Sequence, residues 1–255
     1  MKRRITPYQR QQQEELRQRT LALSQYYQRT LLNQRTKEIK QALGKLEETP
    51  YNKWVEQIPQ ILDEPYLPKY INSLYLNIGV PAARTQINNF LNRKADTDIW
   101  TQTIQNWLNV NAGKKVKIIN ESFKEWMSEN LKSVLHDQTQ SIEALTQTVY
   151  KEVLGRWDNV REWEIRRIVQ TESLGALRTG GIESIKALNT PFVKTWVISG
   201  NNTRPAHQVM DGVTIDETEL FLVDGEQMEY PGDSSQGASA GNIINCACTI
   251  IMTPK

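Results

Sequence analysis

The apolar residues of this 255-residue chain change their spacing once, and this change constrains the fold more than any other feature. Across residues 100–185 they recur at steps of three and four, which is the period of one helix face. Beyond Pro191 they occur in short bulky runs such as Lys194-Thr-Trp-Val-Ile-Ser199, and such runs favour strands. The sequence therefore predicts an α+β protein in which helices precede a small domain of short antiparallel strands.

Two apolar stripes predict a helical bundle over residues 99–190. The first marks one helix face over about five turns and comprises Val116, Ile119, Phe123, Trp126, Met127, Leu131, Val134 and Leu135. The second marks the next helix and comprises Ile142, Leu145, Val149 and Val153. We expect these helices to pack together, because an amphipathic helix buries its apolar face.

The segments before and after the bundle differ from it in composition. Residues 1–48 are rich in Gln and Arg and carry few apolar residues, which predicts a long helical arm that packs on something else. Residues 49–98 contain five prolines and predict a hinge with short helices. Residues 191–255 are predicted to form the small α+β domain, with a helix over 160–185 packed on it.

The two ends of the chain carry opposite charge. Residues 1–40 hold ten Lys or Arg against three Glu, whereas residues 201–255 hold two Lys or Arg against eight Asp or Glu. This asymmetry indicates two different neighbours. The basic arm is either a solvated helix face or a contact for an acidic partner or nucleic acid.

The sequence also predicts where the chain is made. No stretch approaches the roughly 18 consecutive apolar residues of a membrane span, and the first residues lack the apolar core of a signal peptide. We therefore expect a soluble protein made in the cytosol, with no membrane partner. Cys246 and Cys248 are too close in sequence for a relaxed mutual disulfide, so reduced thiols or a bound metal are expected.

A candidate metal site combines these two cysteines with His207. Residues 203–212 predict a short helix that Gly212 ends, with His207 and Asp211 on one face. Alternation over residues 244–252 places both thiols on one side of a strand. Two thiols and an imidazole suit zinc, with Asp211 or water as a fourth ligand. The alternative is a structural cluster without a cofactor, in which two buried thiols lie beside a hydrogen-bonded histidine.

Glu172 breaks the apolar pattern of its helix. It lies within about 20° of Ile165 on the helical wheel, in the centre of the buried face. An unpaired buried carboxylate is costly, so we expect a cation, with Arg204 as the candidate. The pair would clamp the helix to the C-terminal domain; the other interpretation is that Glu172 is a general acid or base.

In these residues the sequence resembles the Mu F-like minor head proteins of tailed phages, also called phage head morphogenesis proteins. The resemblance covers about residues 165–250 and rests on the order of several short motifs. They are Thr171-Glu172, Lys194-x-Trp196, Thr203-Arg204-x-x-His207, Asp211-Gly212, Phe221, Pro231-Gly232-Asp233 and Asn245-Cys246-x-Cys248. The chain departs from the family pattern at Ala247, where Arg is usual, and at Asn201-Asn202, where an acidic residue often precedes the Arg.

The resemblance implies a virion component near the portal vertex, made in the host cytoplasm, that helps head assembly and DNA packaging or delivery. Its expected partners are the phage portal protein, the major capsid protein and, through residues 1–40, phage DNA. The expected role is structural and not enzymatic. Two other hypotheses stay open: a capsid-carried zinc hydrolase or nuclease in which Glu172 activates water, and a DNA-binding module built on residues 1–40.

Overall fold

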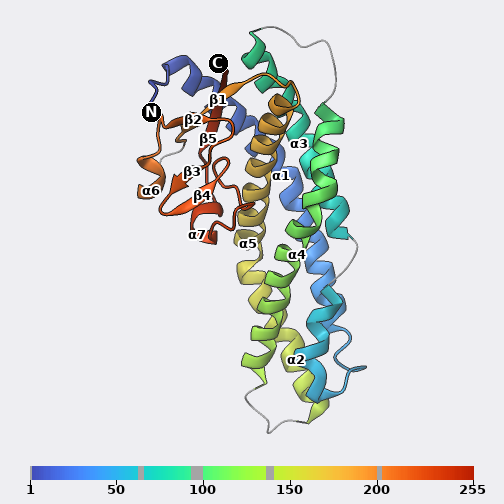
Figure 1. Cartoon of the computed structure of the whole chain (residues 1–255). Helices are drawn as coiled ribbons and strands as arrows, with labels where there is room; N and C mark the ends of the chain where they lie inside the picture. The colour runs from blue at the N-terminus through green and yellow to red at the C-terminus, as the bar shows by residue number, and fades with distance from the viewer. Residues whose placement is uncertain (1, 63–65, 93–99, 136–140, 200–202) are drawn as a thin grey trace. The chain divides into compact units, whose positions relative to one another are not determined.

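The computed structural model describes residues 2–62, 66–92, 100–135, 141–199 and 203–255 (Figure 1). Its long helices are α1 (Pro7–Leu43), α3 (Tyr66–Leu91), α4 (Trp100–Val134) and α5 (Ile142–Lys186). Three short elements lie between α1 and α3: the 3₁₀ turns η1 (Tyr51–Lys53) and η2 (Ile58–Leu62) flank helix α2 (Trp54–Gln57). With 69% of the chain helical, the predicted predominance of helices is confirmed.

The C-terminal part consists of short strands and turns, as predicted. A three-stranded antiparallel sheet has the order β2-β1-β5, built from β1 (Phe192–Val197), β2 (Thr214–Asp216) and β5 (Thr249–Pro254). A separate hairpin joins β3 (Phe221–Val223) to β4 (Glu226–Met228) through Asp224 and Gly225, both with positive φ. Two single-turn helices, α6 (Pro205–Gln208) and α7 (Ala240–Ile243), complete this part. The α+β fold class is therefore confirmed.

The chain divides into two compact units, each built from separated segments. The first contains residues 1–26, 72–110 and 167–255, and the second contains residues 27–71 and 111–166. The predicted domain boundaries near residues 48, 98 and 190 stay predictions.

The second unit holds a buried polar network between its helices. Arg35 is only 2% exposed and donates to the Glu38 carboxylate at 2.7 Å and to the side-chain amide oxygen of Asn120 at 2.5 Å. The same guanidinium lies 4.5 Å from the ring centroid of Phe123. A buried cation needs this combination of partners, because desolvation without them is costly.

Two helices are longer than the sequence predicted. Residues 66–91 form one helix, α3, although Pro81 lies inside it and we expected short helices here. Pro68 lies in the first turn of α3, where a proline costs little, and Pro81 is exposed, while apolar residues around it stay buried. The predicted helix over residues 160–185 is the second half of α5, which continues through Gly180 and Gly181 to Lys186.

Glycines allow α3 and α5 to approach each other within the first unit. A Cβ atom added at Gly180 would lie 2.3 Å from the carbonyl oxygen of Gly79, and one added at Gly181 would lie 2.3 Å from the side chain of Gln86. These glycines therefore serve close helix packing. The crossing fixes the part of α5 that reaches the C-terminal strands.

Substituting Gly180 with Ala should destabilise the protein by about 1–3 kcal/mol, because the added methyl group overlaps the backbone of Gly79. Gly155→Ala is the matched control on the same helix, since nothing lies within 4 Å of its added Cβ. The control should stabilise the protein by up to about 1 kcal/mol through helix propensity. Urea unfolding measures both free energies, and equal shifts of the same sign would contradict this packing.

Candidate metal centre

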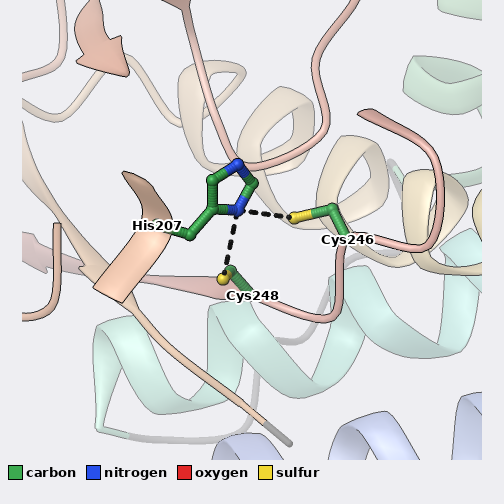
Figure 2. A group of neighbouring side chains, drawn as sticks. All are labelled: His207, Cys246 and Cys248. Carbon is green, nitrogen blue, oxygen red and sulfur yellow. Dashed lines mark hydrogen bonds between the residues drawn. The ribbon is translucent and has the colours of Figure 1, made fainter. Parts of the chain in front are cut away.

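His207, Cys246 and Cys248 come together in the C-terminal part of the first unit, as the sequence predicted. Nδ1 of His207 lies 3.6 Å from Sγ of Cys246 and 3.7 Å from Sγ of Cys248 (Figure 2). The three candidate ligand atoms all lie within 4.8 Å of one another. Each side chain is at most 2% exposed. The group can hold a metal ion.

The two cysteines do not lie on a strand, although we expected the alternation over residues 244–252 to place them on one. They occupy the extended segment after α7, and β5 begins only at Thr249. Both thiols still face the imidazole of His207 (Figure 2).

The distances from Nδ1 of His207 to the two sulfur atoms fit a tetrahedral metal ion. Zinc binds thiolate sulfur at about 2.3 Å and imidazole nitrogen at about 2.0 Å, so a tetrahedral site has S···N edges of about 3.5 Å. The observed S···N separations of 3.6 and 3.7 Å match this edge closely. The ligands therefore need little movement to bind a metal.

A hydrogen-bonded chain holds the imidazole of His207 in the tautomer that a metal needs. The amide nitrogen of Asn242 donates to the Glu226 carboxylate at 2.7 Å, so the amide oxygen faces Nε2 of His207 at 3.1 Å. Nε2 therefore carries the proton and donates it to Asn242. The lone pair on Nδ1 is left facing the two thiols, which is the usual arrangement of a metal-binding histidine.

The two thiols differ in their tendency to ionise. The thiol of Cys248 donates to Cys246 and holds the pKa of Cys246 well below its usual range, and the charge of Arg178 acts in the same direction. The same contact, together with burial, raises the pKa of Cys248. Metal binding at these thiols would release protons, because thiolate is the form that binds a metal.

Arg178, which the sequence analysis missed, connects helix α5 to the cysteine segment. Its side chain is 2% exposed, its Nε donates to the carbonyl oxygen of Cys248 at 2.8 Å, and its Nη2 donates to that of Cys246. A sequence signal existed, because Arg178 is the only charged residue between Glu172 and Glu183. Asn242 and Glu226 were also missed, and no pattern in the sequence marks them.

The predicted ion pair between Glu172 and Arg204 is wrong. Both residues are among those that the structure describes, and they have different partners: Glu172 accepts from the hydroxyl of Tyr75 at 2.9 Å, and Arg204 donates to the carbonyl of Ile244. Arg178 forms the link from helix to C-terminal domain that we assigned to this pair. Its planar guanidinium satisfies two carbonyls at once.

Asp211 does not belong to the metal centre, although we considered it as a fourth ligand. Its carboxylate accepts from Arg10 at 2.6 and 3.2 Å and from the backbone nitrogen of Ile198 at 3.1 Å. Among the described residues, the metal-ligating group therefore comprises His207, Cys246 and Cys248.

Comparisons with known proteins add no further assignment. No protein-family model, no curated protein and no solved structure matches this chain. Among the described helices, none is both long enough and apolar enough to cross a membrane.

Replacing Arg178 with Met should destabilise the protein by about 2–4 kcal/mol, because the carbonyls of Cys246 and Cys248 would be left buried without a donor. Arg166→Met, at an exposed position of the same helix, is the control and should stay within about 0.5 kcal/mol of the parent protein. Chemical unfolding followed by tryptophan fluorescence measures both. Equal free energies of unfolding for the two variants would exclude a structural role for Arg178.

Proposed function

We propose that His207, Cys246 and Cys248 bind one zinc ion, and that this ion stabilises the C-terminal α+β domain. The supporting observation is that an imidazole lone pair and two thiols face one another at tetrahedral spacing, with the imidazole already fixed by Asn242. Two thiolates and an imidazole suit zinc better than they suit harder cations. A water molecule would complete the tetrahedron.

Burial favours a structural role for this metal over hydrolysis. The three ligands are each at most 2% exposed, whereas a catalytic zinc keeps a position that substrate can reach. Glu172, the residue that would activate water in a hydrolase, accepts a hydrogen bond from the hydroxyl of Tyr75 at 2.9 Å. The alternative of a zinc-dependent hydrolase or nuclease therefore has less support than a metal that holds short strands together.

We further propose that the protein is a minor capsid protein of a tailed phage that docks near the portal vertex and assists head assembly and DNA packaging or delivery. This proposal rests on the resemblance to Mu F-like minor head proteins. Its structural support is that the motifs, which are spread over residues 165–250, meet around one centre. Three contacts between motifs carry this point.

The first contact joins the ends of the motif series, because the hydroxyl of Thr171 accepts from the backbone nitrogen of Asn245 at 3.1 Å. In the second, the rings of Trp196 and Phe221 pack edge to face with centroids 5.2 Å apart. In the third, Gly232 lies beside the cysteine motif: a Cβ added at Gly232 would lie 3.6 Å from the Cβ of Cys246. Chance matches to scattered motifs have no reason to converge in this way, so the contacts support the family assignment.

Contact with portal, major capsid protein or DNA would fall to residues that the fold leaves accessible. Several basic residues of the N-terminal arm stay exposed, namely Arg4, Arg19, Arg29, Lys37 and Lys40. Exposed cations suit an acidic protein surface or a phosphate backbone. The virion, close to the portal, is therefore the proposed location.

Purified protein should contain about one zinc per chain, and Cys246→Ser should lower the content below about 0.2. Removing zinc with a chelator should lower the melting temperature, because binding to the folded state alone stabilises that state. Glu172→Gln is the control and should keep the full zinc content. Elemental analysis measures these values, and a chain that binds no zinc would contradict the proposed centre.

Co-expression with a candidate portal protein should yield a complex that survives size-exclusion chromatography. Changing Arg19 and Arg29 to Glu tests whether the basic arm forms the contact. If it does, the affinity for the portal protein should fall at least about tenfold. Glu15→Gln is a matched control on the same helix. Absence of the chain from purified phage particles, measured by mass spectrometry, would contradict the proposed function.

A further inference from the structure

The first described residues of the chain dock on the C-terminal domain. Lys2 forms an antiparallel bridge with Val213, and the backbone nitrogen of Arg3 donates to the carbonyl of Gly212 at 2.7 Å. The packing is tight, because a Cβ added at Gly212 would lie 2.7 Å from the carbonyl oxygen of Arg3. Residues 2–10, which we call the N-terminal segment, belong to the same compact unit as this domain.

An ion pair fastens the other end of the N-terminal segment. The guanidinium of Arg10 contacts both carboxylate oxygens of Asp211, at 3.2 and 2.6 Å. Asp211 is held in place because Oδ1 also accepts from the backbone nitrogen of Ile198. A bidentate contact to a fixed carboxylate is geometrically more specific than an ordinary surface ion pair. The basic start of the chain thus meets its acidic end within one molecule.

These anchors lie on the same turn as the proposed metal ligand His207. The carbonyl of His207 accepts from the backbone nitrogen of Met210 at 3.1 Å, and the carbonyl of Met210 accepts from that of Val213 at 2.8 Å. Residues 207–213 therefore form one continuous hydrogen-bonded turn. It presents the imidazole to the two thiols, while Asp211, Gly212 and Val213 hold the N-terminal segment.

We propose that metal binding at His207, Cys246 and Cys248 and docking of the N-terminal segment are energetically coupled through this turn. A metal bond to His207 adds to the hydrogen bond from Asn242 and further restrains the turn that carries the carboxylate of Asp211 and the carbonyl of Gly212. Loss of the metal therefore weakens docking of the segment. Linkage makes the effect reciprocal: docking strengthens metal binding by the same factor. The inference rests on the proposed zinc centre and adds that the metal controls the release of Arg3, Arg4 and Arg10 toward an acidic partner.

Hydrogen exchange of the full-length protein tests the release. Removing zinc with a chelator should speed exchange of the amides of residues 2–10 by at least about fivefold, the lower end of ordinary coupling between sites. The amide of Trp196, bonded to Val213 at 2.9 Å, reports whether the β-sheet stays folded. Full zinc binding with unchanged exchange in residues 2–10 would overturn the coupling and leave the metal centre intact.

The reciprocal measurement uses protein that stays folded with zinc, and it decides the question if zinc removal also unfolds the sheet. Arg10→Gln should weaken zinc affinity at least about fivefold in a competition assay with a chromophoric chelator. Arg19→Gln is the matched control, because Arg19 is an exposed residue of α1. The zinc affinity of this variant should equal that of the parent protein. Equal affinities for both variants would overturn the coupling, whereas a parent protein that binds no zinc would overturn the metal centre itself.

Discussion

The C-terminal domain depends on the buried guanidinium of Arg178. This side chain comes from the long helix α5 and donates to the carbonyls of Cys246 and Cys248, the two residues that carry the thiols. A lysine could not replace it, because the planar guanidinium aims several donors in fixed directions. Short strands and single-turn helices bury little apolar surface, so the domain takes its order from this contact with a rigid helix. Close packing of α5 on α3, where Gly180 meets Gly79, holds that helix in place.

Neighbouring side chains orient the candidate ligands before a metal arrives. Arg178 holds the backbone of the cysteines, and Asn242 with Glu226 holds the imidazole of His207. Trp196 packs edge to face on the imidazole, with ring centroids 5.4 Å apart, and closes the site from the β1 side. Ligands that are already placed lose little entropy on binding, which favours high affinity.

The sequence predicted this arrangement only in part, for identifiable physical reasons. The helical spacing and the short strand-like runs were sufficient to predict the α+β class. The donor types of His207, Cys246 and Cys248 were sufficient to predict the candidate ligands. The partner of Glu172 was wrong, because a hydrogen bond from Tyr75 depends on how α3 packs on α5, which local periodicity does not encode. The contact of Arg10 with Asp211 joins residues 201 positions apart and was likewise beyond local patterns.

The central claim is that a metal ion bridges α6 and the cysteine segment, and X-ray absorption at the zinc edge tests it most directly. We expect two sulfur neighbours at about 2.3 Å and at least one nitrogen at about 2.0 Å in the zinc-loaded protein. We also expect that Cys246→Ser removes one sulfur neighbour from this shell. A zinc environment made of oxygen and nitrogen alone, unchanged by that substitution, would contradict the account.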